Sequence, residues 1–344
     1  MTSRLPLLLL AGFCTTAPAL EAWDYDGHRI VNQLALAGLP PAFPAFVRTP
    51  EAAERIAFLA GEPDRWRNVT DLPLRQANGL DHYLDLEQLA AAGLTPGTAS
   101  ALRYEFATQF AAGRAQHPDN FPALDPLKNT DHTREWPGFL PWAITEHYEM
   151  LKSAFSSLRT FEESGGTPAE IANAQADVVH AMGVMGHYVG DSTQPLHTTI
   201  HNNGWVGANP KGYTTWEGFH AWIDGGFNAK IGLTLADVAA RARPAKVLPT
   251  ATAAGARDTL FGEIMNHLVA ENARVEPLYA LDKEKKLSGT MPGSEEGRAF
   301  IEEQLLRGGE LLSSLWLTAW RNAQPDSYLR AQLIKRQVRA AGAK

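Results

Sequence analysis

The segment from His187 to His197 holds two imidazoles and a carboxylate at spacings that favour metal binding. On a helix, His187 and Asp191 lie at positions i and i+4, so their side chains project from the same face. Pro195 cannot continue that helix, which allows His197 to approach from the other side. The segment is otherwise apolar, and an unpaired carboxylate buried there would be costly. We therefore expect these side chains to bind metal, with satisfied polar groups in the core as the alternative.

A second pair, His220 and Asp224, repeats the same spacing. One such pair could arise by chance in a chain with 11 histidines, so the pair alone carries little weight. Neutral imidazoles and carboxylates are typical ligands of zinc, and the lack of thiolates disfavours softer metals. Zinc is therefore the expected ion, with manganese or another divalent cation as the alternative.

Residues 1–22 have the features of a secretory signal. They contain one arginine, an apolar run over Leu5–Leu10 and small residues toward the end. The pattern fits cleavage after Ala19 slightly better than cleavage after Ala22. The expected localisation is periplasmic or secreted. The only cysteine, Cys14, lies in this segment, so the mature chain would contain no disulfide.

The composition is that of a globular protein. With 344 residues, of which 44% are hydrophobic, the chain can build a sizeable core. Its net charge of −7 disfavours the basic surface that nucleic-acid-binding domains commonly use. A nucleic-acid substrate would therefore require a local source of positive charge.

Helical periodicity dominates the sequence, and runs of alternating β-branched residues are nearly absent, so we predict an all-α fold. Thr167, Pro168 and Glu170 provide an N-cap, a first-turn proline and a capping box. They predict a helix that reaches about Asp191. Apolar stripes predict two further helices, one through Ile144, Tyr148, Leu151, Phe155 and Leu158, and one through Phe300 or Ile301, Leu305, Leu312, Leu315 and Ala319.

Three glycines, Gly183, Gly186 and Gly190, interrupt the helix that carries the first pair. Because glycine lacks a side chain, they would let a neighbouring helix pack closely. They would also leave room for an ion around His187.

We expect a single mostly helical domain, because no break in composition divides the chain and no internal repeat is present. This domain would cover 23–330 and follow the signal over 1–22, and residues 331–344 would form a C-terminal tail. Stretches rich in proline, glycine and polar residues predict the main loops at 116–141, 198–215 and 281–293.

Four upstream residues are weak ligand candidates when each is taken alone: Trp23, His28, Asp64 and His82. Their order, followed by the segment ending at His197 and by the second pair, resembles the S1/P1 nuclease and zinc phospholipase C superfamily. The match spans about Trp23 to Asp224. The resemblance implies a helical, exported enzyme with three zinc ions in a cleft. The missing disulfides depart from the eukaryotic members of the family and indicate a bacterial branch.

The resemblance also implies how nine ligands divide among the three ions. One ion would be held by Asp64, His82, His187 and Asp191. The second would be held by Trp23, His28 and the bridging carboxylate of Asp191, and the third by His197, His220 and Asp224. Trp23 would bind through its free α-amino nitrogen and its carbonyl oxygen, which requires cleavage directly after Ala22.

The chemistry implied by the resemblance is hydrolysis of a phosphodiester. Two neighbouring ions would lower the pKa of a shared water, and the remaining ion would stabilise the leaving oxygen. Asp64 would orient and deprotonate that water. Arg67 matches a family arginine near the phosphate, with a surface salt bridge as the alternative for this side chain.

Tyr83 and Asp85 fall where the nucleases of this family stack an aromatic ring on a base and hydrogen-bond its edge. The alternatives are that Tyr83 packs in the core and that Asp85 caps the next turn. The expected substrate is single-stranded DNA or RNA, cut by an endonuclease to 5′-phosphorylated products, with 3′-nucleotidase activity as a further expectation. Three divalent ions would supply the positive charge that the chain lacks.

Two other functions are open at this point. A phospholipase C-like hydrolase of phospholipid head groups would share the ligands. The resemblance favours a nuclease, because the last ligand is Asp224 and not the glutamate that is typical of the lipase branch. A non-catalytic exported metal-binding protein would also share them, without an open coordination position for water. The loop between His197 and His220 departs from the family pattern, so specificity is open as well.

Overall fold

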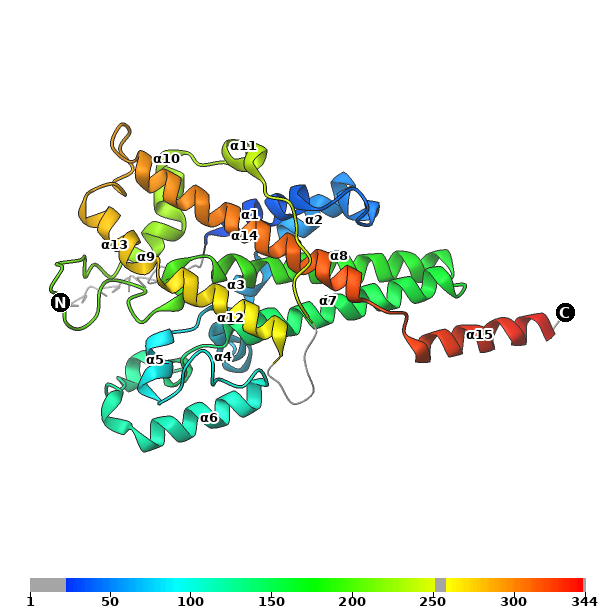
Figure 1. The fold of residues 1–344 in the computed structure, drawn as a ribbon, viewed down its shortest axis with the longest axis horizontal. Helices are drawn as coiled ribbons and strands as arrows, with labels where there is room; N and C mark the ends of the chain where they lie inside the picture. Colours follow the sequence, from blue (N-terminus) through cyan, green and yellow to red (C-terminus); the bar gives the residue numbers. More distant parts are fainter. Residues whose placement is uncertain (1–22, 251–257, 343–344) are drawn as a thin grey trace, which may run out of the picture.

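A computed structural model describes residues 23–250 and 258–342. The expected signal, residues 1–22 with Cys14, lies outside the described residues. The described residues form one all-α domain without a strand, which confirms the fold class predicted from periodicity (Figure 1). Among these residues, no helix is both long enough and apolar enough to cross a membrane.

Two long antiparallel helices, α7 and α8, form the centre of the fold (Figure 1). α7 covers Leu140–Glu163, and α8 covers Pro168–Ser192 and starts with the predicted capping box. α14 covers Glu295–Asn322, and α2 covers Pro50–Leu59. α8 packs against α7, α14 and α2. The three helices predicted from the sequence, α7, α8 and α14, are confirmed.

Shorter helices surround this centre and carry several of the candidate residues. They are α1 (Tyr25–Gly38), α3 (Glu62–Arg67), α4 (Leu72–Gly79), α5 (Leu86–Ala91), α6 (Arg103–Gln116), α9 (Phe219–Ala221), α10 (Phe227–Ile231), α11 (Leu235–Val238), α12 (Thr259–Asn272), α13 (Val275–Lys283) and α15 (Ser327–Gly342). The side chain of Asp24 caps α1 by accepting a hydrogen bond from Gly27 N at 3.1 Å. This cap fixes the first turn of α1, from which His28 projects.

Close packing of α1 on α8 depends on glycines in α8. A Cβ atom at Gly186 would lie 1.7 Å from Asn32 Oδ1, and one at Gly190 would lie 2.7 Å from His28 Nδ1. Asn32 is fully buried, and its Nδ2 donates to backbone carbonyls of α2 and α8. The missing side chains therefore allow His28 to lie against the face of α8 that carries His187.

The expected loops lie close to their predicted places. The first, 116–141, contains three short 3-10 turns and ends where α7 begins. The second, 198–215, contains no helix after its first residue. The third, 281–293, starts slightly later because α13 continues to Lys283.

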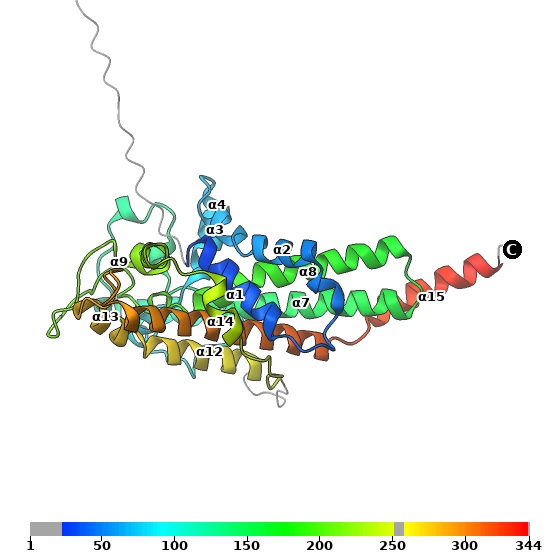
Figure 2. The ribbon, with the colours of Figure 1, turned by 90° about the horizontal axis from the view of Figure 1, so that it is seen from above.

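The boundary expected after residue 330 needs correction, because it falls inside α15. The described part of the expected tail, 331–342, continues this helix without a break. Leu333 is buried, and Arg336 forms an ion pair of 2.7 Å with Glu170 at the start of α8. These contacts hold α15 against the domain, and Figure 2 shows the helix reaching beyond the ends of α7 and α8.

Candidate metal centre

Side chains from distant parts of the chain meet in three groups around the carboxyl end of α8. The groups are His28, His187 and Asp191; Asp64, His82 and His187; and His197, His220 and Asp224. Within each group, one ligand atom per residue lies within 4.8 Å of the others. Every side chain except Asp64 is buried. The structure thus brings together the eight side chains that the sequence singled out as candidate ligands.

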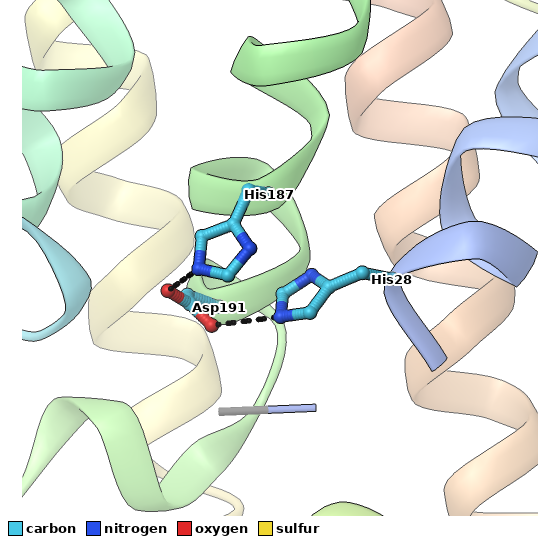
Figure 3. A group of neighbouring side chains, drawn as sticks. All are labelled: His28, His187 and Asp191. Atoms are coloured by element: carbon cyan, nitrogen blue, oxygen red, sulfur yellow. Dashed lines mark ion pairs between the residues drawn. The ribbon is translucent and has the colours of Figure 1, made fainter. Parts of the chain in front are cut away.

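Asp191 takes part in the first group through both carboxylate oxygens (Figure 3). Its Oδ2 lies 3.3 Å from His187 Nε2, and its Oδ1 lies 3.5 Å from His28 Nε2. The two imidazole rings stack with their centroids 3.9 Å apart. His187 and Asp191 come from successive turns of α8, whereas His28 comes from α1. One carboxylate therefore faces two helices, as a bridging ligand would.

The second group adds short elements to α8. His82 ends a 3-10 turn, and its Nδ1 lies 3.0 Å from Asp191 Oδ2 and 2.9 Å from His187 Nε2. Asp64 is part of α3, and its Oδ1 lies 3.9 Å from His187 Nε2. Because His187 belongs to both groups and Asp191 faces both, ions held here would be close neighbours.

The third group lies where a helix widens into a π-turn. α9 continues into the π-helical residues Trp222–Gly226, which include Asp224, and then into α10. His220 Nε2 lies 2.8 Å from Asp224 Oδ2 and 3.1 Å from His197 Nε2. His197 belongs to a 3-10 turn that follows α8. Such π-turns are frequent at functional sites.

Hydrogen bonds fix the tautomers of three of these histidines. The Nδ1 atoms of His187, His197 and His220 lie 2.7, 2.6 and 3.1 Å from backbone carbonyl oxygens. A carbonyl only accepts, so each Nδ1 carries a proton and each Nε2 of a neutral ring offers a lone pair. When the His220 ring is neutral, its lone pair and that of His197 face each other across 3.1 Å. A cation between them would turn this repulsion into ligation, in the manner typical of metal-binding histidines.

Buried atoms without hydrogen-bond partners also mark the centre. Among the described residues, neither ring nitrogen of His28 has such a partner, nor does Nε2 of His82. Both side chains are fully buried, and leaving such groups unsatisfied costs roughly 1–3 kcal/mol each. A cation bound beside Asp191 would satisfy Nε2 of His28, which lies 3.5 Å from Asp191 Oδ1. Nε2 of His82 lies on the side of the ring away from Asp191, which the Nδ1 of this histidine faces. The set of imidazoles and carboxylates therefore fits divalent metal ions.

Burial keeps most of the imidazoles in the form that binds metal. It lowers the pKa of His28, His82 and His197 well below the usual 6.5, so these rings are neutral at pH 7. Burial also raises the pKa of Asp191 to about 6. Because a bound cation favours the ionised carboxylate, metal would reverse this shift.

Two histidines differ because each faces a carboxylate. Burial lowers the pKa of His187, but attraction to Asp191 outweighs burial, and the pKa is raised overall. The same balance, with Asp224 as the partner, raises the pKa of His220. A metal ion must displace protons from these rings before it binds.

Metal binding at pH 7 is therefore expected to release protons. Zinc should be titrated into metal-free protein by calorimetry, in two buffers of different ionisation enthalpy. The heats should differ by the protons released, and affinity should rise by up to about tenfold per pH unit for each proton. Equal heats in the two buffers would contradict the raised pKa of His187 and His220.

Arg67 lies beside the groups. Its Nε is 2.8 Å from Asp64 Oδ1, and the two side chains are only 15% and 13% exposed. Together with burial, the charge of the guanidinium lowers the pKa of His28, His82 and His197. Arg67 is thus a partly buried cation that acts on the whole centre, rather than one half of an exposed salt bridge.

The described chain starts next to the centre. Trp23 is fully buried, and its indole Nε1 donates to Gly190 O at 3.0 Å. Asp24 N donates to Asp224 O at 3.2 Å, which places this segment between α8 and the π-turn. The α-amino nitrogen expected as the ninth ligand exists only in a chain processed directly before Trp23.

Tyr83 and Asp85 follow His82 in the sequence. The Tyr83 ring is half-buried, and its hydroxyl donates to Thr133 O at 3.4 Å. Asp85 is buried, accepts a hydrogen bond from Gln88 Nε2 at 2.7 Å, and has a pKa raised by burial to about 7. Its side chain does not cap α5, and its Oδ1 has no hydrogen-bond partner among the described residues. Asp85 thus keeps one buried acceptor without a partner.

Sequence reasoning did not select Gln194, which connects three candidate ligands. Its Nε2 donates to Asp224 Oδ1 at 2.5 Å. Its backbone N donates to Asp191 O at 3.0 Å, and its backbone O accepts from His197 N at 2.9 Å. Its place between two ligands, directly before Pro195, is the one signal that could have indicated a role. Gln194 orients the carboxylate of the third group.

Replacing Gln194 with methionine, which keeps the length but not the amide, is expected to weaken the third group. A hydrogen bond to a metal ligand contributes about 10–100-fold to affinity, so at limiting zinc the variant should retain about two ions where the parent retains about three. Elemental analysis after dialysis measures this. Gln332→Met, on the exposed surface of α15, is the matched control. Equal zinc content and affinity in all three proteins would exclude this role.

The described residues therefore contain three His/Asp groups that could hold metal ions, with Arg67 beside them. Neutral imidazoles, facing lone pairs and unsatisfied buried atoms all favour this use over polar residues satisfied within the core. No protein-family model matches the chain, and no curated protein matches it either.

Proposed function

We propose that the protein is a zinc-dependent phosphodiesterase that cleaves single-stranded DNA and RNA and releases 5′-phosphorylated products. Hydrolysis of 3′-nucleotides would be a second reaction of the same centre. The observation that carries the proposal is the position of Asp191, which faces His28 with one oxygen and His82 and His187 with the other. A shared carboxylate supports closely spaced ions, which suit in-line attack on a phosphoryl group.

The surrounding side chains have the properties that this reaction needs. When bound, zinc ions lower the pKa of water toward about 7 and stabilise charge on phosphoryl oxygens. Asp64, the one partly exposed carboxylate of the groups, can orient the attacking water and accept its proton. Arg67 offers a fork of donors to a phosphoryl oxygen beside it.

The charge of the chain does not oppose an anionic substrate. The formal net charge is −7, and three divalent cations would offset most of it. The positive charge would then be concentrated where the phosphate must bind. Affinity would rest on this centre and on stacking of bases, which suits single strands better than duplexes.

Tyr83 and Asp85 support a nucleic acid over a lipid. An aromatic ring can stack on any base, which contributes roughly 1–3 kcal/mol per base. A carboxyl group with a pKa of about 7, as burial gives Asp85, can donate or accept at a base edge. A lipid head group offers no planar ring to either side chain.

A panel of substrates tests the proposal. Single-stranded DNA, RNA, duplex DNA and phosphatidylcholine should be assayed after chelation and again after addition of zinc. We expect zinc-dependent hydrolysis of both single strands, slower hydrolysis of the duplex and none of the lipid. Hydrolysis of phosphatidylcholine but of no nucleic acid would show that the protein is a phospholipase and not a nuclease. Bound zinc without turnover of any substrate would leave a metal-binding protein.

Replacing Tyr83 with alanine is expected to raise KM for single-stranded DNA by about tenfold, because stacking on one base is lost. Zinc content should not change, since no ligand is altered. Tyr83→Phe is the matched control, because it keeps the ring and removes only the hydrogen bond to Thr133 O. A parallel loss of zinc and of DNA binding in Tyr83→Ala would refute the assignment of a base-binding role.

A further inference from the structure

A cavity of about 610 Å³ lies beside α6, outside the three metal-binding groups. Figure 1 shows α6 below α7, near α4 and α5. Cavities of roughly 300–1,000 Å³ are typical of sites for small molecules. Its lining is mostly apolar, with one arginine and one glutamate among the lining residues. None of the lining residues has a part in the proposed hydrolysis.

Three aromatic rings line the cavity. Phe110 is fully buried, and its ring centroid lies 5.9 Å from that of Phe121 and 6.2 Å from that of Trp136. The Phe121 and Trp136 side chains are half-buried, whereas Pro122 and Ala123 at the rim are exposed. A partly exposed ring beside an accessible cavity favours a planar ligand that stacks on it.

Arg114 places a positive charge in the lining of the cavity. Its Nη1 donates to Glu135 O at 2.6 Å, and its guanidinium carbon lies 5.0 Å from the centroid of the Phe121 ring. No carboxylate of the described residues forms an ion pair with it. The carboxylate of Glu135 instead accepts from His132 Nδ1 at 2.7 Å and from Asn129 Nδ2 at 3.0 Å. Donors of Arg114 are therefore left for an anion.

We propose that this cavity binds a nucleobase together with its phosphate. The base would stack on the half-buried ring of Trp136, and the phosphate would accept hydrogen bonds from Arg114. Two sources supply this chemistry, a free mononucleotide or one nucleotide of a single strand. The inference rests on the proposed function for the choice of ligand, but the site shares no residue with the metal centre.

A short segment connects the cavity with the proposed base-binding pair. Trp136 lines the cavity, and the next residue, Pro137, accepts a hydrogen bond at its carbonyl from Asp85 N at 2.7 Å. Two residues before the cavity wall, Thr133 O accepts from the Tyr83 hydroxyl. The segment that carries Trp136 is thus in direct contact with Tyr83 and Asp85, the proposed base-binding pair.

Binding of adenosine 5′-monophosphate to the zinc-loaded protein tests the proposal. Calorimetry should resolve one molecule at the metal centre and one in the cavity. Arg114→Ala should weaken the second by at least about tenfold, since a charge-assisted hydrogen bond is lost. Trp136→Leu should weaken it as well. Arg339→Ala, which removes an exposed arginine of α15, is the matched control and should bind as the parent does.

Loss of metal separates this site from the proposed function. The Asp191→Asn protein should still bind one nucleotide, and adding Arg114→Ala should remove that binding. If Arg114→Ala, Trp136→Leu and the parent all bind the nucleotide identically, the cavity site is overturned while the nuclease proposal stands. Melting curves of each variant verify that the chain is folded.

Kinetics then identify the source of the nucleotide. KM should be measured for single-stranded DNA of about two and about eight nucleotides. If the cavity holds part of a strand, Arg114→Ala raises KM by about tenfold for the longer substrate and leaves the shorter unchanged. If the cavity holds a free mononucleotide, neither KM changes, although binding of adenosine 5′-monophosphate is weakened.

Discussion

Replacing Asp191 with asparagine is expected to remove metal ions and hydrolysis together. The carboxylate lies between two groups, with Oδ2 3.0 Å from His82 Nδ1 and Oδ1 3.5 Å from His28 Nε2. An amide of the same shape has no negative charge and only one accepting atom. It cannot serve two cations at once. The loss should therefore extend to both ions that share this residue.

The expected effect is large. Without the ions there is no activated water, so turnover of single-stranded DNA should fall by at least about a thousandfold. Elemental analysis should show at most about one ion per chain, because Asp191 belongs to the first group and faces the second, whereas the third group does not include it. Asp177→Asn, in the same helix but exposed, is the matched control and should behave as the parent does. An Asp191→Asn protein that keeps its metal and its activity would contradict the proposed metal centre.

Stability separates loss of metal from damage to the fold. Burial raises the pKa of Asp191 from 3.8 to about 6, so ionising this carboxyl destabilises the folded, metal-free chain. This destabilisation is absent below pH 3.8, grows until about pH 6 and is constant above it. The metal-free variant should therefore be more stable than the metal-free parent at pH 7. A variant that is less stable than the parent both with and without added zinc would indicate damage to the fold.

Removing metal from the unchanged protein is expected to lower its melting temperature by at least about 10 °C. Each ion present at about a thousand times its Kd adds roughly 4 kcal/mol to the stability of the folded chain. Without ions, the nearest partners of buried carboxylates such as Asp191 and Asp224 among the described residues are histidines and polar side chains. The affected parts should be the segments that meet at the centre.

Calorimetric melting with and without a chelator measures this effect. Adding zinc back should restore both the melting temperature and hydrolysis of single-stranded DNA. A chelator already saturated with zinc is the control and should change neither. Identical melting curves before and after complete removal of metal would show that the fold does not depend on the ions.

The helices were predictable from the sequence because their signals are local. The capping box at Thr167 and the apolar stripes lie within single turns or within one helix, and they appear in the structure where expected. The step of four residues from His187 to Asp191 likewise predicts one shared helix face. The same spacing correctly predicts that His220 and Asp224 lie close together. It does not reveal that the backbone there forms a π-turn.

The arrangement of the centre depends on contacts between distant residues, which local patterns do not encode. Asp64 and His82 each lie in a short element with no periodicity around it, so only resemblance to a family selected them. Local patterns did not indicate Gln194, because its hydrogen-bond partner, Asp224, is 30 residues away. They did not indicate the cavity beside α6 either, because Arg114 and Trp136 meet only in the folded chain.

The spread of the ligands along the chain has a consequence for its durability. The sequence has one cysteine, so no internal disulfide can form. His82 and His187, which are 105 residues apart, would be tied by a cation at the same place where a disulfide would tie two thiols. In the chain-entropy account, a link across about 100 residues restrains the unfolded chain by roughly 4–5 kcal/mol. Where zinc is scarce, loss of the ions would at once abolish catalysis and loosen the fold. The loosened chain would then be accessible to proteases.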